Sequence, residues 1–294
     1  MMPATEIAAA LNLRPMPGRR EWRGACPACG YSATLVLTET EDGALWWCAS
    51  CQDRQAVTAA LRQVMARDWM PPHEVGPCRI SAPSPAQKSA LARTLWDAAR
   101  PHPGTPVDHY LAVRGLSGVQ SAELRFHPDA RHPGGSRMPA MIAAIRDTLS
   151  GEVQAVHRTY LRPGGGGKAA MEPAKASLGP VTGGAVILDA INPGVPLVIG
   201  EGIETSLSAA RMIGGAAWCA VSAGNLIKLR LPDHAQDVIV AADADAPGQR
   251  AAEVTARRWQ AEGRRVRIAT PDRSGLDFND LLCALHTVRE ASRG

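Results

Sequence analysis

The last third of the chain alternates short apolar runs with segments of helical periodicity. The apolar runs cover residues 196–199, 216–221 and 238–240, and glycine, proline or polar residues flank each of them. Continuous apolar runs of this length are typical of strands that are buried on both faces, as in a parallel sheet. Residues 203–212 have helical spacing. The pattern therefore predicts an α/β domain with a mostly parallel sheet over residues 186–294.

Acidic residues follow two of these predicted strands. Glu201 comes directly after the first strand, and Asp243 and Asp245 follow the third. Side chains at positions i and i+2 of a strand share a face, so the two aspartates converge on one ion if the extended conformation continues through them. Mg²⁺ prefers such oxygen ligands, and ligands of open parallel sheets bind at the carboxyl ends of the strands. The alternative for the Asp-X-Asp pair is a turn or a helix cap.

Two Cys-X-X-Cys motifs lie near the start of the chain. Cys26 and Cys29 form the first, Cys48 and Cys51 form the second, and eighteen residues separate them. This spacing is typical of a four-cysteine zinc ribbon, in which the thiolates bind one tetrahedral ion. The intervening segment predicts two short strands, and a domain this small would draw much of its folding energy from the metal.

Two disulfides are the alternative for these cysteines. The first thirteen residues resemble no secretory signal, because they include Glu6 and no basic leader. We therefore expect a reducing, cytoplasmic compartment, which disfavours disulfides.

Proline placement and charge divide the rest of the chain. Prolines make regular helix impossible over residues 70–85, which predicts a linker between a zinc-binding domain at 1–69 and an α+β subdomain at 86–185. That subdomain is predicted to contain helices at 86–99 and 107–114 and an exposed strand at 157–161. Residues 125–175 include eight Lys or Arg against four Asp or Glu. The middle subdomain is therefore expected to be basic.

Composition restricts the kind of partner. The 294 residues are 45% hydrophobic, but no apolar run is long enough to cross a bilayer, so no membrane partner is expected. The net charge of +4 is modest, so nucleic-acid binding must come from local patches. Trp46 and Trp47 could stack on bases of a single strand. Consecutive strand residues face opposite ways, so at most one of the two is expected to be exposed.

The order of motifs from residue 196 onward resembles the Toprim domain, which bacterial-type primases, topoisomerases and certain nucleases share. The resemblance implies a Rossmann-like fold, acid/base or metal-binding chemistry for Glu201, and metal binding for Asp243 and Asp245. Residues 275–280 resemble an Asp-Asn-Asp element of primase Toprim domains, which adds Asp277 and Asp280 as metal ligands. The alternative for these last two residues is a helix N-cap.

A second resemblance concerns the basic middle region. Residues 157–179 resemble the strand and loop that precede the Toprim domain in bacterial and phage-type primases, which implies contacts of Arg158, Lys168 and Lys175 with template or nucleotide phosphates. Phrases within residues 96–128 are similar to primase-like proteins of phages and mobile genetic elements. The resemblance thus covers most of residues 86–290.

These features lead to three functional hypotheses. The first is a DNA primase that makes short RNA primers on single-stranded DNA from nucleoside triphosphates, with structural Zn²⁺ and catalytic Mg²⁺ or Mn²⁺. The alternatives are a Toprim-type nuclease, which needs the same metal geometry, and a non-catalytic DNA-binding replication accessory protein. The zinc ribbon and the basic segment favour the primase. Because the sequence has no recognisable helicase segment, a separate replicative helicase is an expected partner.

Overall fold

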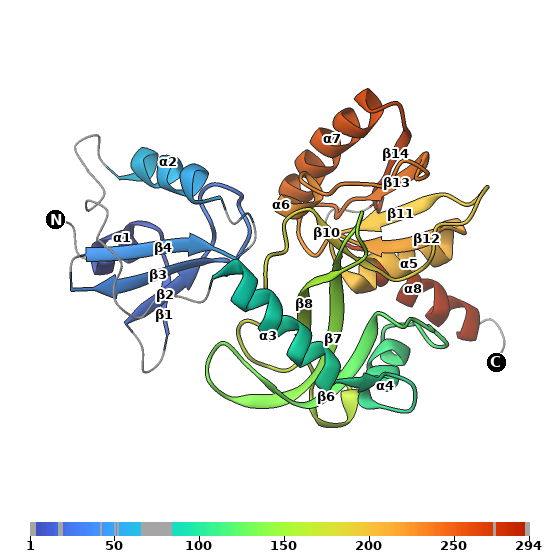
Figure 1. The fold of residues 1–294 in the computed structure, drawn as a ribbon, viewed down its shortest axis with the longest axis horizontal. Helices are drawn as coiled ribbons and strands as arrows, with labels where there is room; N and C mark the ends of the chain where they lie inside the picture. The colour runs from blue at the N-terminus through green and yellow to red at the C-terminus, as the bar shows by residue number, and fades with distance from the viewer. Residues whose placement is uncertain are drawn as a thin grey trace. The chain divides into compact units, whose positions relative to one another are not determined.

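The computed structural model describes residues 4–16, 20–41, 43–49, 51, 53–65, 84–272 and 275–291. The chain divides into two compact units, Met1–Ala82 and Pro83–Gly294 (Figure 1). The linker predicted at 70–85 lies outside the described residues except for its last two positions. Within the described part of the chain, no helix is long and apolar enough to cross a membrane.

The amino-terminal unit is a small antiparallel sheet with two helices. The strands pair in the order β1-β2-β3-β4. Their bounds are Arg14–Pro15 (β1), Glu21–Gly24 (β2), Leu35–Thr40 (β3) and Gly43–Cys48 (β4), and the helices are Ala4–Ala10 (α1) and Arg54–Val64 (α2). Leu35 and Leu37 of β3 are fully buried in one cluster with apolar side chains of both helices. The predicted small β region is therefore confirmed.

The two adjacent tryptophans of β4 face opposite sides of this sheet. Trp46 packs against the core, and its indole Nε1 donates a hydrogen bond to Thr58 Oγ1 of α2 at 3.1 Å. Trp47 is 51% exposed. The prediction that at most one of them is exposed is confirmed.

The second unit is built on a ten-stranded sheet with the main order β14-β13-β11-β12-β10-β7-β6-β5, in which β8 pairs with β7 and β9. Its strands are Arg100–Pro101 (β5), Leu124–Arg131 (β6), Arg137–Asp147 (β7), Val153–Tyr160 (β8), Lys175–Leu178 (β9), Gly184–Ile187 (β10), Leu197–Gly200 (β11), Ala216–Cys219 (β12), Asp237–Ala241 (β13) and Arg265–Ala269 (β14). Its helices are Pro85–Ala98 (α3), Pro106–Val113 (α4), the 3₁₀ turn Pro163–Gly165 (η1), Ile203–Ile213 (α5), Ala223–Leu226 (α6), Ala246–Ala261 (α7) and Phe278–Ala291 (α8).

Strands β11 to β14 form the parallel part of this sheet. β11 pairs in parallel with both β12 and β13, and β13 pairs in parallel with β14. Figure 1 shows α7 and the packed pair α5 and α8 on opposite sides of these strands. The chain thus winds outward in both directions from β11 and β13, and the predicted mostly parallel α/β fold is confirmed.

The middle region is antiparallel and continuous with the parallel strands. β7 pairs with β6 and β8 along most of its length, and its last residues pair with β10, which in turn pairs with β12. One core cluster contains Tyr110 of α4, Met141 of β7 and Val198 of β11. The boundary at 185/186 stays a prediction, because sheet and core continue across it.

The prediction of an exposed strand at 157–161 is wrong. β8 is hydrogen-bonded on both edges, to β7 and to β9. All five residues of that segment are buried, with exposures of 9% or less. The polar residues of this segment suggested exposure to solvent. They are buried in an interior strand because their side chains find hydrogen-bond partners within the fold.

Asn225 of α6 holds the loop after β12 in place. This residue is 4% exposed. Its Oδ1 accepts from Gly183 N, and its Nδ2 donates to the carbonyl oxygens of Gly184 and Ala220, all at 2.8 Å. The side chain therefore joins the loop after β12 to the start of β10.

Asn225→Ala is expected to lower the free energy of unfolding by about 3 kcal/mol, because it leaves three buried backbone groups without partners. Urea unfolding followed by circular dichroism measures this loss. The matched control is Asn192→Ala, whose exposed side chain makes a single hydrogen bond, to Ala190 O at 3.3 Å. Equal midpoints for the two variants would contradict the role of Asn225.

Candidate metal centres and the side chains around them

The first candidate metal centre lies at the carboxyl ends of β11 and β13. These two strands are paired neighbours, with Gly200 opposite Ala241 at their last positions. Glu201 follows β11 directly, and Asp243 comes two residues after the end of β13. The chain leaves these strands in opposite directions, so the acids lie at the switch point where open α/β sheets bind ligands.

Gly200 lets helix α5 begin close to the end of β11. A β-carbon at this position would come within 2.9 Å of Ser206 Oγ and 3.2 Å of Ser206 N. With glycine there, Gly200 N donates to Ser206 Oγ, which in turn donates to Gly202 O. The turn that carries Glu201 is therefore held between strand and helix, with the Glu201 side chain only 6% exposed.

Asp245 is the N-cap of α7. Its backbone is extended, and its Oδ1 accepts a hydrogen bond from Gly248 N at 2.7 Å. A side chain at residue 248 would approach this oxygen to 3.0 Å, so glycine keeps the cap accessible. The helix-cap alternative thus holds for Asp245, whose second carboxylate oxygen can still face a ligand.

Asp243 is the acid on which the neighbouring carboxylates act most clearly. Burial raises its pKa to about 6, helped by the charges of Asp277, Asp245 and Asp280. Its buried Oδ1 has no hydrogen-bond partner within the described residues. A buried carboxylate oxygen among like charges is a position that a divalent cation would stabilise, so the donor set fits Mg²⁺ or Mn²⁺.

Asp277 and Asp280 form a reciprocal cap at the start of α8. Asp277 Oδ1 accepts from Asp280 N at 2.9 Å, and Asp280 Oδ2 accepts from Asp277 N at 3.1 Å. Asn279 between them is fully buried and donates from Nδ2 to Arg114 O and Ser208 Oγ. The N-cap alternative therefore holds for the pair, although both carboxylates act on Asp243; their metal binding stays a prediction.

The two predicted phosphate-binding lysines meet at one carboxylate that the sequence did not reveal. Glu204, on the first turn of α5, is 3% exposed. Lys168 Nζ lies 3.2 Å from its Oε1, and Lys175 Nζ lies 3.3 Å from its Oε2. Tyr110 of α4 donates its hydroxyl to the same carboxylate. The available sequence signal is an acidic residue in the first turn of a predicted helix, and the structure buries residues 203–210 of that helix.

Arg158 is placed differently from the lysines. It is buried, and its guanidinium donates to the backbone carbonyl oxygens of Arg131, Ala176 and Ser177. These contacts join β8 to β9 and to the end of β6. These contacts favour a structural role for Arg158, and its predicted contact with phosphates stays a prediction.

His157 lies on the same strand as Arg158. Burial lowers its pKa to about 3, and the charge of Lys175 adds to this effect. Its Nδ1 lies 3.1 Å from Ser177 Oγ. A neutral, hydrogen-bonded histidine in the sheet is consistent with a structural role.

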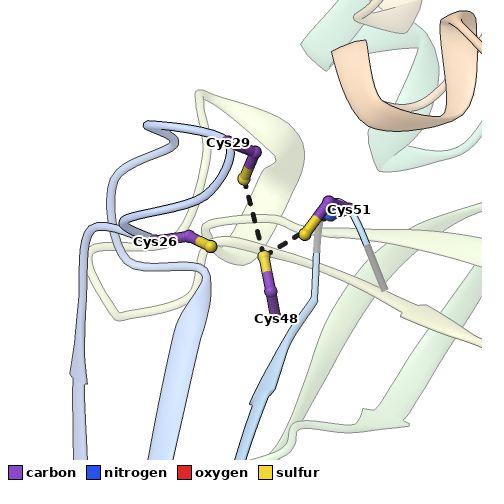
Figure 2. Close-up of side chains that lie close together, drawn as sticks. All are labelled: Cys26, Cys29, Cys48 and Cys51. Atoms are coloured by element: carbon purple, nitrogen blue, oxygen red, sulfur yellow. Dashed lines mark hydrogen bonds between the residues drawn. The ribbon is translucent and has the colours of Figure 1, made fainter. Parts of the chain in front are cut away.

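The second candidate metal centre is the cysteine cluster of the amino-terminal unit. Cys26 precedes a turn closed by Gly30 N donating to Cys26 O, and Cys48 ends β4. The four Sγ atoms lie within 4.8 Å of one another, and those of Cys29 and Cys48 are 3.7 Å apart (Figure 2).

The spacing of these sulfur atoms fits a metal better than a disulfide. Four thiolates at about 2.3 Å from a tetrahedral Zn²⁺ stand about 3.8 Å apart. A disulfide would need roughly 2.0 Å. The four cysteines are not joined by disulfide bonds and form a cluster that fits a zinc ribbon. In the described part of the chain, no other set of three or more potential ligands comes this close.

The fold and the acids at its switch point define the carboxyl-terminal part of the chain as a Toprim domain. Residues 196–286 match the family described as Toprim domain. Residues 86–188 match a family described as a domain of unknown function, DUF7146. The predicted Toprim domain is thereby confirmed. The search of curated proteins found no match.

Several solved structures are similar to the chain. The primase fragment of the bacteriophage T7 primase-helicase protein is 17% identical, with a TM-score of 0.41 over 92% of this chain and 97% of that one. The zinc-binding and RNA polymerase domains of the Aquifex aeolicus primase are 11% identical, with a TM-score of 0.47 over 98% and 82%. The RNA polymerase domain of Mycobacterium tuberculosis primase in complex with double-stranded DNA is 16% identical, with a TM-score of 0.42 over 70% and 80%.

Proposed function

We propose that this protein is a DNA primase that joins ribonucleotides on a single-stranded DNA template by metal-dependent nucleotidyl transfer. The observation that carries the proposal is the combination, in one chain, of acids at the Toprim switch point with a four-thiolate cluster. Bacterial-type primases, which the motif order resembles, combine these two parts.

The acids would bind the catalytic metal. Asp243, with its buried carboxylate oxygen, would be the central ligand, and Glu201 and Asp245, which follow the ends of β11 and β13, would be the others. Mg²⁺ or Mn²⁺ bound there would lower the charge of a nucleoside triphosphate and favour attack on its α-phosphorus. Glu201, only 6% exposed, would bind the same ion or accept a proton from the attacking hydroxyl.

The basic side chains and the zinc unit would hold the substrates. Lys168 and Lys175 pair with Glu204, Lys175 also acts electrostatically on Asp243, and both lysines would contact nucleotide or template phosphates. Asp277 and Asp280 would be further candidate ligands of the metal. The exposed Trp47 would stack on a template base. A separate replicative helicase would supply the single strand.

A priming assay tests the proposal. Purified protein is incubated with single-stranded DNA of varied sequence, labelled ribonucleotides and Mg²⁺ or Mn²⁺. The expected result is a ladder of short labelled RNA that disappears when the metal is chelated. Metal-dependent degradation of the DNA without any RNA product would instead identify the chain as a nuclease, which uses the same acids.

A further inference from the structure

Glu204 lies at the centre of a buried ion-pair network that includes both candidate phosphate-binding lysines. Lys168 comes from the segment after η1, paired to the end of β8 through a bridge with Leu161, and Lys175 is the first residue of β9. Each ammonium pairs with a different oxygen of Glu204. We refer to Lys168, Lys175 and Glu204 as the lysine clamp.

The carboxylate of Glu204 stays ionised inside the protein. Its burial opposes ionisation, but Lys175, Lys168 and the Tyr110 hydroxyl outweigh this effect and hold its pKa well below the usual range. One carboxylate pairs with two ammonium groups. Within the clamp itself the positive charge therefore exceeds the negative charge by one, and an anion could neutralise it.

The lysines remain accessible although their partner is buried. The Lys168 side chain is 27% exposed and that of Lys175 is 35% exposed, against 4% for Glu204. An ammonium has three donors, and the ion pair with Glu204 uses one of them on each lysine. The other donors can bind an anion that approaches from solvent.

The clamp lies next to the acids of the candidate metal centre. A β-carbon on Gly202, the residue after Glu201, would stand 3.9 Å from Lys175 Nζ and 3.6 Å from Glu204 Oε2. Lys175 also acts electrostatically on Asp243. An anion that binds a divalent metal at Asp243 could therefore reach the clamp as well.

We propose that Glu204 is a positioning residue, which holds Lys168 and Lys175 so that both ammonium groups bind the polyphosphate of the metal-bound nucleotide. This role rests on the proposed function. Free lysine side chains lose rotamer entropy when they bind a phosphate, and a buried carboxylate that already fixes them removes part of that cost. Tyr110 positions Glu204 in turn, because its hydroxyl comes from a fully buried side chain on α4.

Nucleotide binding measured without turnover tests the role of Glu204. Isothermal titration calorimetry with ATP and Mg²⁺, and separately with inorganic tripolyphosphate and Mg²⁺, is expected to show roughly tenfold weaker binding for Glu204→Gln. Glu253→Gln is the matched control. Glu253, like Glu204, forms an ion pair with a basic residue, but its partner is Arg257 and the pair is exposed on α7. The control should bind like the wild type.

A pH series separates positioning from a purely structural role. Burial lowers the pKa of Lys168 to about 8; Glu204 raises it, while Lys175 and Arg114 lower it. The ammonium is present below this pKa and is lost as the pH rises through it. Without the Glu204 charge the pKa falls further, so tripolyphosphate binding by Glu204→Gln should weaken at a lower pH than in the wild type.

Two results would overturn the proposal: wild-type protein that binds neither ligand, or Glu204→Gln that folds and binds both with unchanged affinity and pH dependence. If Glu204→Gln does not fold, as judged by circular dichroism, the same titrations are made with Tyr110→Phe. This variant keeps the packing and removes the hydroxyl that donates to Glu204. A loss of roughly threefold in affinity is expected for it, and no loss would count against the clamp. Because binding needs no catalysis, a protein that fails to prime still reports on Glu204.

Discussion

Asp243→Asn is expected to reduce primer synthesis roughly a thousandfold, which corresponds to about 4 kcal/mol of transition-state stabilisation. The substitution keeps the shape of the side chain but removes the charge that would bind the catalytic metal. Two assays measure it: labelled RNA in the priming assay, and Mn²⁺ binding followed by electron paramagnetic resonance, which reports on the metal without catalysis.

The same substitution should make the protein more stable. The pKa of Asp243 lies at about 6, raised first by burial and then by neighbouring carboxylates. An acid whose pKa is higher in the folded than in the unfolded protein destabilises the fold at pH values above that pKa. A neutral asparagine removes this cost, so the melting temperature of metal-free Asp243→Asn should exceed that of wild type at pH 7.5.

The matched control for Asp243→Asn is Asp233→Asn, an exposed aspartate in the loop before β13. It should prime, bind Mn²⁺ and melt like the wild type. If Asp243→Asn kept its priming activity, Asp243 could not be a ligand of the catalytic metal. A lower melting temperature would contradict the electrostatic account of the site.

Cys48→Ser is expected to abolish zinc binding and to unfold the amino-terminal unit. Cys48 ends β4, is 1% exposed, and belongs to the same core cluster as Leu35 and Leu37. Structural zinc contributes roughly 10 kcal/mol or more to small domains of this kind, which exceeds the whole stability of most domains of that size.

Two measurements follow the loss of zinc. Elemental analysis should find about one zinc per wild-type chain and none in the variant. Tryptophan fluorescence should shift to longer wavelength as Trp46 and Trp22 leave the core. Cys283→Ser is the matched control, since this free cysteine of α8 lies outside the cluster, and it should keep its zinc. Wild-type protein without zinc, or a folded zinc-free variant, would contradict the role of the cluster.

Local sequence patterns predicted the elements that carry most of the site. The predicted strands at 196–199 and 238–240 correspond to β11 and β13, and the helix predicted at 203–212 corresponds to α5. These predictions succeeded because a buried parallel strand must be continuously apolar and because glycine marks a tight turn. The cysteine spacing predicted the thiolate cluster for a similar reason, since one tetrahedral ion restricts where its four ligands can lie.

The sequence did not reveal contacts whose partners are distant in the chain. Arg158 is predicted to contact phosphates, which stays a prediction, and its carbonyl partners lie between 18 and 27 residues away in sequence. The partners of Glu204 include Tyr110, 94 residues away, and Lys175, 29 residues away. A basic or acidic residue has the same appearance in a sequence whether it faces solvent or a buried partner.

The sequence by itself determined the mostly parallel α/β fold of the carboxyl-terminal part, the thiolate set of the amino-terminal unit and the acids at the strand ends. Each of these follows from local periodicity or spacing, which act over a few residues. Only the tertiary structure decided that Asp245 and Asp277 also cap helices, that β8 is interior, and that both lysines share the buried Glu204. Those outcomes depend on which segments are brought together by sheet pairing and burial.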